Sequence, residues 1–219
     1  MKKLLTSVFC IFACLVCANA QLIFSDAPSS GEFGEAPSAW NILQGGSCIT
    51  ILNGAKVISL PPYSTQFEAN TSVITPKMDE ALPQSYSIEF DFYMYAKNFD
   101  ANNEFWVELF EGDECVLDFE HAIGAINGKC SFSCACIREN GEADEFSGFY
   151  LVNKDDWNHF KLSVKGNSAL VLINGKKAAT VASLKKASAF ALKSEQRYMG
   201  EERSNMRGTQ FRNFEISRD

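Results

Sequence analysis

Carboxylate and aromatic side chains alternate with apolar ones along two stretches of this sequence, in a composition suited to holding a sugar. Sugars stack their apolar C–H faces on aromatic rings, while their hydroxyls form hydrogen bonds with carboxylates and amides. The alternation predicts that these side chains share outward faces of β-strands. We therefore expect a ligand-binding surface formed by Glu89, Asp91, Tyr93, Tyr95, Trp106 and Glu108. The alternative is that Trp106 packs under a loop and that the polar residues are the solvated faces of ordinary strands.

Three oxygen-bearing side chains are candidates for a calcium site. Asp100 and Asn102 lie in one predicted loop, and Asp26 follows the first predicted strand. Calcium binds carboxylate and amide oxygens of this kind. Neither segment has the spacing of a known calcium loop, so the alternative is an ordinary solvated turn.

Five cysteines follow residue 20, and three of them fall on one face of a predicted strand: Cys130, Cys134 and Cys136, with Cys48 and Cys115 elsewhere. Their spacing is not that of a zinc finger or zinc ribbon. Neighbours on one strand are poor disulfide partners, although either could reach a cysteine on an adjacent strand. Because five is an odd number, at least one thiol is expected to be free, most simply as a small buried hydrophobe.

Short alternating strands separated by Asn-Gly or Gly-Asn pairs position these residues. The clearest example is Asp156–Val181, where Gly166-Asn167 and Asn174-Gly175 suit the hairpin turns of a three-stranded antiparallel meander. In this meander we expect Trp157 in the core and His159 on the surface. Residues 78–82 are the one short stretch where a helical turn is expected. The pattern predicts an all-β protein with two antiparallel sheets packed as a jelly-roll sandwich, in preference to a closed barrel.

The first 20 residues have the features of a secretory signal. Lys2 and Lys3 precede an apolar run, and Ala18-Asn19-Ala20 is a cleavage site of small residues. The alternative is a lipoprotein signal that is modified at Cys14. We expect a signal peptide at 1–20, a single domain at 21–219, and export to the periplasm, the outer membrane or the medium. No later segment is apolar enough to cross a membrane.

Net charge excludes two classes of partner. Removal of residues 1–20 takes two lysines and no acidic residue, so 18 basic and 27 acidic residues remain, with a net charge of −9. Nucleic acids and anionic lipids bind basic patches, so neither is expected as a partner. Neutral ligands and cations are compatible with this balance.

Several short motifs occur in an order that resembles one group of proteins. They are L-I-F-S-D at 22–26, N-G-A-K-V-I-S at 53–59, S-I-E-F-D-F-Y at 87–93 and F-R-N-F-E-I at 211–216. The chain resembles the N-terminal β-sandwich of OmpA-family envelope proteins of Bacteroides-like bacteria, which is similar to concanavalin A-like and laminin G-like domains. The resemblance implies this fold and, by analogy, a glycan or an envelope protein as partner. In that group a peptidoglycan-binding OmpA domain follows the sandwich, whereas this sequence ends at Asp219.

A partial catalytic motif leaves an enzyme as the alternative. Glu89-x-Asp91 resembles part of the E-x-D-x-(x)-E motif of family 16 glycoside hydrolases. Hydrolysis of a glycosidic bond generally needs two flanking carboxyl groups, but the remaining Glu of the motif is replaced by Tyr93 or Met94. The expected function is therefore a non-catalytic binding module, with a carbohydrate-active enzyme and a structural protein-interaction domain as alternatives.

Overall fold

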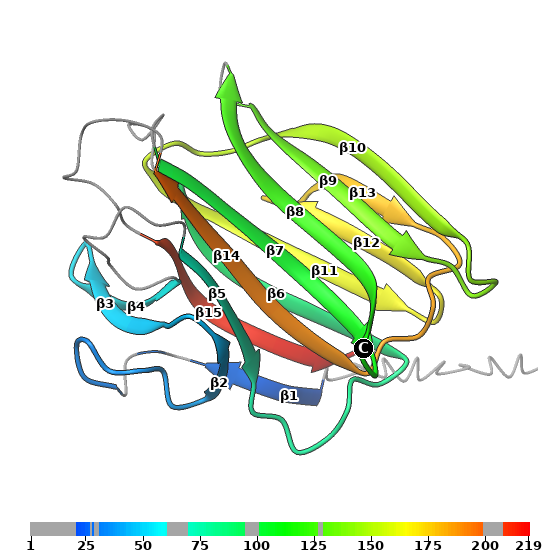
Figure 1. Ribbon diagram of the computed structural model, residues 1–219, viewed down its shortest axis with the longest axis horizontal. Helices are drawn as coiled ribbons and strands as arrows, with labels where there is room; N and C mark the ends of the chain where they lie inside the picture. The colour runs from blue at the N-terminus through cyan, green and yellow to red at the C-terminus, as the bar shows by residue number, and fades with distance from the viewer. Residues whose placement is uncertain are drawn as a thin grey trace, which may run out of the picture.

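The computed structural model describes residues 21–26, 28, 31–60, 70–94, 101–126, 129–198 and 208–219. Regular structure in these ranges is almost entirely β-strand. The strands form two antiparallel sheets that lie one over the other (Figure 1). No helix in the described part of the chain is long and apolar enough to span a membrane.

One sheet contains eight strands among the described residues. These are β1 (Gln21–Asp26), β3 (Cys48–Leu52), β4 (Ala55–Leu60), β6 (Ser85–Met94), β11 (Asp156–Lys165), β12 (Ser168–Ile173), β13 (Lys176–Val181) and β15 (Thr209–Arg218). Their order is β13-β12-β11-β6-β15-β4-β3, and β1 also pairs with β15. The three strands β11, β12 and β13 are the meander that the sequence predicts.

The other sheet contains seven strands within the same described ranges. These are β2 (Trp40–Gln44), β5 (Asn70–Pro76), β7 (Ala101–Glu111), β8 (Glu114–Ile126), β9 (Lys129–Ile137), β10 (Ala143–Leu151) and β14 (Ala189–Tyr198). Their order is β10-β9-β8-β7-β14-β5-β2. Strands that follow one another in sequence, such as β6 and β7, can therefore lie in different sheets.

Alternation along each strand sends the large apolar side chains into the space between the sheets. Phe90 lies at the centre of this core and stacks on Phe160, with ring centroids 4.7 Å apart, and on Phe214, at 4.5 Å. Phe105 of the opposite sheet meets the edge of Phe90 at 6.0 Å. Each fully buried ring of this kind contributes about 1.5–3 kcal/mol through loss of apolar contact with water. The core is what joins the two sheets.

The predicted turns form where expected. Asn174 and Gly175 have φ angles of 51° and 72°, as a primed hairpin turn requires, and Gly166 has a φ of 60°. One local prediction was wrong, because residues 78–82 form a bend rather than a turn of helix. Leu82 is instead held in an extended connection by the bond from its N–H to the carbonyl of Ser188.

Some predictions fall outside the described residues. They concern residues 1–20, including Cys14, as well as Tyr95 and Asp100. The prediction of a loop at Asn102 was wrong, because its backbone lies in β7, while its side chain is outside the described part.

Candidate functional site

The described candidate ligand-binding residues lie on two different surfaces. Glu89, Asp91 and Tyr93 project from β6 on the outer face of the eight-stranded sheet, because Ile88, Phe90 and Phe92 between them point into the core. Trp106 and Glu108 project from β7 on the outer face of the seven-stranded sheet. The structure does not bring the two groups together, so each face has to be considered as a separate candidate.

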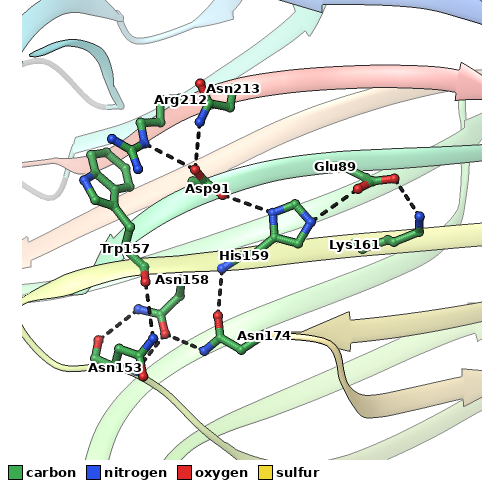
Figure 2. A network of polar contacts seen from close by, with 10 residues as sticks. All are labelled: Glu89, Asp91, Asn153, Trp157, Asn158, His159, Lys161, Asn174, Arg212 and Asn213. Atoms are coloured by element: carbon green, nitrogen blue, oxygen red, sulfur yellow. Dashed lines mark hydrogen bonds and ion pairs between the residues drawn. The ribbon is translucent and has the colours of Figure 1, made fainter.

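Asp91 is the centre of a polar network on the eight-stranded sheet (Figure 2). Its carboxylate accepts hydrogen bonds from Asn213 Nδ2 at 2.8 Å and Arg212 Nε at 3.2 Å, and its other oxygen lies 3.0 Å from His159 Nδ1. A β-bulge in β15 between Arg212 and Glu215, with Asn213 at a φ of 55°, turns two successive side chains toward the same carboxylate. Local backbone irregularity therefore builds this centre.

Glu89 extends the network along β6. His159 Nε2 lies 3.3 Å from one carboxylate oxygen of Glu89, and Lys161 Nζ donates to the other at 2.7 Å. Burial on its own would raise the pKa of Glu89, but the hydrogen bonds and positive charges of Lys161 and His159 outweigh it and hold the pKa below its ordinary value. The negative charges of Glu89 and Asp91 are thus balanced by basic side chains on the adjacent strands.

Trp157 packs beside this network on the same face. The Arg212 guanidinium lies 4.0 Å from the centroid of its ring, and Tyr93 meets it edge-on at 5.4 Å. Tyr93, Trp157, Leu52 and Val57 form a small apolar cluster outside the main core. The prediction that Trp157 belongs to a core therefore holds only for this outer cluster, while His159 is exposed as predicted.

Hydrogen bonds of the Asn158 side chain fix the backbone where the meander begins. Its buried amide accepts bonds from the Asn153 N–H at 2.7 Å and from Asn174 Nδ2 at 2.9 Å, and it donates to the Asn153 carbonyl at 2.9 Å. Asn174 in turn accepts from the His159 N–H at 2.9 Å (Figure 2). These bonds join the β10–β11 connection to the Asn174-Gly175 turn, so the role of Asn158 is structural.

The seven-stranded sheet carries a different arrangement of charge. Glu108 of β7 is directly opposite Asp118 of β8, and Trp106 is directly opposite Glu120. Burial, followed by the charge of Asp118, raises the pKa of Glu108, and Lys193 counters this only in part. Burial likewise raises the pKa of Asp118, and one of its carboxylate oxygens is buried without a hydrogen-bond partner among the described residues. Partly dehydrated carboxyl groups that lack matching donors are typical of binding and catalytic sites.

Trp106 stands at one end of this carboxylate group. Only 7% of its surface is exposed, and Lys193 Nζ lies 4.3 Å from the centroid of its ring. At the other end, a shallow hollow of about 340 Å³ opens over β9 and β10, where small residues face outward. The lining residues are Ser133, Cys134, Ala135, Glu145, Phe146 and Ser147. Because Ser133 and Ala135 are paired with Glu120 and Asp118, the hollow adjoins the carboxylates.

The remaining candidates have structural positions. Asp26 is buried and accepts a hydrogen bond from the indole N–H of Trp40, while burial raises its pKa. No group of three or more His, Cys, Asp or Glu residues in the described ranges is arranged to hold a metal ion. Cys130, Cys134 and Cys136 share the buried face of β9, as predicted, and the five cysteines of the described part are free thiols.

Asp118, Glu120 and Lys193 were missed by reasoning from the sequence alone. The alternation in V-L-D-F-E-H at 116–121 is typical of a strand, and it places Asp118 and Glu120 on the same outward face. That shared face is the signal that could have identified them. Lys193 joins them only because β14 pairs with β7, which no local pattern indicates.

Comparison with known proteins gives a clear result for structure only. No protein-family model matches the chain, and no curated protein sequence matches it. Among solved structures, the chain is similar to the catalytic domain of a laminarinase from Thermotoga maritima, with a TM-score of 0.60 and 12% identity over 91% of this chain and 98% of that one. It is also similar to the carbohydrate recognition domain of Emp47p, with a TM-score of 0.57 and 12% identity over 91% and 96%.

A third similar structure is a glycoside hydrolase family 16 endo-glucanase from Bacteroides ovatus, with a TM-score of 0.56 and 12% identity over 89% of this chain and 98% of that one. Identities this low carry information about the fold alone. They confirm the predicted fold class, which is an all-β jelly-roll sandwich of the concanavalin A-like type.

Proposed function

We propose that this chain is an exported carbohydrate-binding module and that its ligand lies on the outer face of the seven-stranded sheet. The observation that carries the proposal is the row of carboxyl groups at Glu108, Asp118 and Glu120, beside Trp106 and an open hollow. Sugar hydroxyls can donate to the Asp118 oxygen that lacks a donor among the described residues, whereas Glu120 accepts a hydrogen bond from Ser133 Oγ at 2.8 Å. Trp106, with Lys193 over its ring, bounds one end of the row. Similarity to carbohydrate-recognition and laminarinase domains supports a glycan as the ligand.

The eight-stranded face is the weaker candidate. There Glu89 and Asp91 already accept hydrogen bonds from Lys161, Arg212 and Asn213. A ligand would have to replace these bonds rather than add to them, and an exchange of equivalent bonds yields little net affinity.

Charge indicates the class of glycan. The proposed surface carries four acidic side chains near one lysine, Lys193, and the chain has an acidic balance overall; the four are Glu108, Asp118, Glu120 and Glu145. Neutral glycans or amino sugars suit this surface, whereas uronic acids and sulfated glycans would be repelled. A place in the bacterial envelope, with a signal peptide at 1–20 and a single domain at 21–219, is part of the proposal and is supported by the resemblance to OmpA-family sandwiches.

The test is a binding screen of purified residues 21–219 against host, dietary and bacterial-wall glycans, with calcium and with a chelator. We expect saturable binding that is abolished by Trp106→Ala and weakened at least tenfold by Asp118→Asn. Asp91→Asn on the opposite face is the matched control and should bind normally. Binding that survives both Trp106→Ala and Asp118→Asn but is lost in Asp91→Asn would refute this placement.

A second function, glycoside hydrolysis, is favoured by one specific observation. Glu108 and Asp118 are opposed carboxyl groups whose pKa values are both raised, and a glycosidase needs one carboxyl group that stays protonated as the acid. Release of reducing sugar from a bound polysaccharide, lost in Glu108→Gln while binding persists, would establish the enzyme. Saturable binding without turnover would establish the module.

A further inference from the structure

A second hollow, of about 460 Å³, opens where several connections between strands meet, and it shares no lining residue with the hollow over β9 and β10. It is surrounded by the connection before β6, the connection between β13 and β14, the turn after β11 and the turn after β9. Its buried lining is apolar apart from one hydroxyl group and consists of Leu82, Tyr86, Val164, Leu184 and Ala187. The exposed part of the lining is largely polar, with Gln84, Glu139, Lys185 and Lys186, and the size is within the range of small-molecule sites.

Backbone hydrogen bonds hold the walls of this hollow in place. The Leu184 N–H donates to the Asn167 carbonyl at 2.7 Å, and the Lys185 N–H donates to the Ile137 carbonyl at 2.9 Å. The Leu82 N–H donates to the Ser188 carbonyl at 2.9 Å, which fixes the opposite wall. The hollow therefore exists before any ligand arrives, and binding would carry little cost of ordering.

Tyr86 lines the hollow, and its buried hydroxyl is an unused donor. Only 1% of the residue is exposed, and its hydroxyl has no hydrogen-bond partner among the described residues. Burial raises the pKa of Tyr86 above its ordinary value, so the hydroxyl keeps its proton. A buried hydroxyl without a partner loses the hydrogen bonds it made to water, and a ligand group that bonds to it would restore one.

The rim carries charges of both signs, and the Glu139 carboxylate keeps its negative charge, because the amide of Asn167 that donates to it is neutral. Lys185 is paired with Glu114, and Glu139 accepts a hydrogen bond from Asn167. No ion pair joins the Lys186 ammonium to another residue in the described ranges, and its side chain is exposed. The hollow thus has an apolar buried lining with one hydroxyl group, and a mouth at which Lys186 and Glu139 carry opposite charges.

We propose that this hollow is a binding site for a small carboxylic acid with an apolar ring and a polar group at its far end. The carboxylate lies at Lys186, the ring lies against Leu82, Val164 and Leu184, and the far polar group bonds to the Tyr86 hydroxyl. This site is independent of the glycan surface, so either proposal stands if the other fails.

The experiment is an NMR titration of residues 21–219 with para-hydroxybenzoate, benzoate and para-hydroxybenzamide. Benzoate lacks the group that meets Tyr86, and the amide lacks the charge that meets Lys186. We expect saturable shifts at the hollow with a Kd of about 1 mM or tighter for para-hydroxybenzoate, and weaker binding of the other two. Tyr86→Phe should weaken para-hydroxybenzoate about two- to tenfold and leave benzoate unchanged.

Control variants distinguish specific binding at this site from non-specific binding. Tyr86→Phe removes a hydroxyl that makes no bond within the described structure, so the variant should fold as the parent does. Lys186→Gln should weaken both acids but not the amide, whereas Lys177→Gln, on exposed β13, should change nothing. Absence of saturable shifts, or equal affinity of para-hydroxybenzoate for the parent and for Tyr86→Phe, would overturn the proposal.

Discussion

His121 should make the free energy of unfolding of this protein decrease steeply as the pH falls. Its ring lies wholly inside the sandwich, stacked on Phe105 at 4.7 Å between centroids, with Nδ1 against the Tyr150 hydroxyl. Its Nε2 is buried and has no partner among the described residues. Burial lowers the pKa of His121 from its ordinary 6.5 to about 3, because a charged imidazolium would lose its water.

The direction and size of the effect follow from this pKa. Above pH 6.5 the ring is neutral in both the folded and the unfolded chain, so its contribution does not vary with pH. As the pH falls from 6.5 to about 3, the unfolded chain binds a proton that the folded chain does not, and the free energy of unfolding decreases. At about 1.36 kcal/mol per pH unit, the loss reaches about 5 kcal/mol, comparable with the whole stability of many domains.

Urea denaturation at several pH values between 7.5 and 4 tests this on the parent and on His121→Phe. The variant should cost about 1–3 kcal/mol at neutral pH, since Tyr150 loses its partner, but its stability should fall far less in acid. Other titrating groups are common to both proteins and cancel in the difference. Tyr150→Phe keeps the histidine and should keep the slope. If the parent and His121→Phe lose stability in parallel, the assignment of the slope to His121 is refuted.

Three further outcomes are expected. Asn158→Ala should lower the free energy of unfolding by about 3 kcal/mol, because several buried groups lose their partner at once; a urea melt measures it. Gly45→Ala should be far more destabilising than Gly112→Ala in a thermal melt, since both glycines have a positive φ but only at position 45 would a Cβ lie 2.3 Å from the Thr71 carbonyl oxygen. Cys134, whose pKa burial raises to about 12, should resist iodoacetamide in the native protein and react only on unfolding, as mass spectrometry would show.

The strands that the sequence predicts well are those with one face in the core and one in water. In β6, and in β11 from Phe160 onward, every second residue is apolar, and Gly166-Asn167 and Asn174-Gly175 mark the two turns within the meander. The edge strand β10 was not predicted, because little of it is buried and Gly148 interrupts its pattern. That glycine is required by packing, since a Cβ there would lie 2.7 Å from the ring of Phe132. Close packing of this kind between two neighbouring strands does not produce a periodic pattern in the sequence.

The candidate surface was harder to predict than the fold. Alternation fixes which residues of one strand share a face, and it correctly placed Trp106 with Glu108. It contains no information about the sheet to which a strand belongs, so it wrongly groups Glu89 and Asp91 with Trp106 and Glu108. The partner carboxylate, Asp118, is ten residues further along the chain and meets Glu108 only through the β7–β8 register. Register depends on the turn and on the whole core, and not on either strand alone.

The two outer faces differ in what stands opposite each carboxylate, and this difference predicts opposite effects of the same substitution. Asp91 is opposite His159 and accepts bonds from Arg212, so Asp91→Asn should reduce stability by about 1 kcal/mol. Asp118 is opposite Glu108, and like charges in that position are destabilising, so Asp118→Asn should raise stability by about 1 kcal/mol at pH 7. The same Asp118→Asn protein should bind glycan poorly, as expected where a site retains an unfavourable contact for the sake of its ligand. Urea melts and the glycan screen, run on both variants, measure this trade-off between stability and glycan binding. If Asp118→Asn is less stable than the parent, the carboxylate pair is part of the architecture, and the argument for a ligand on this face fails.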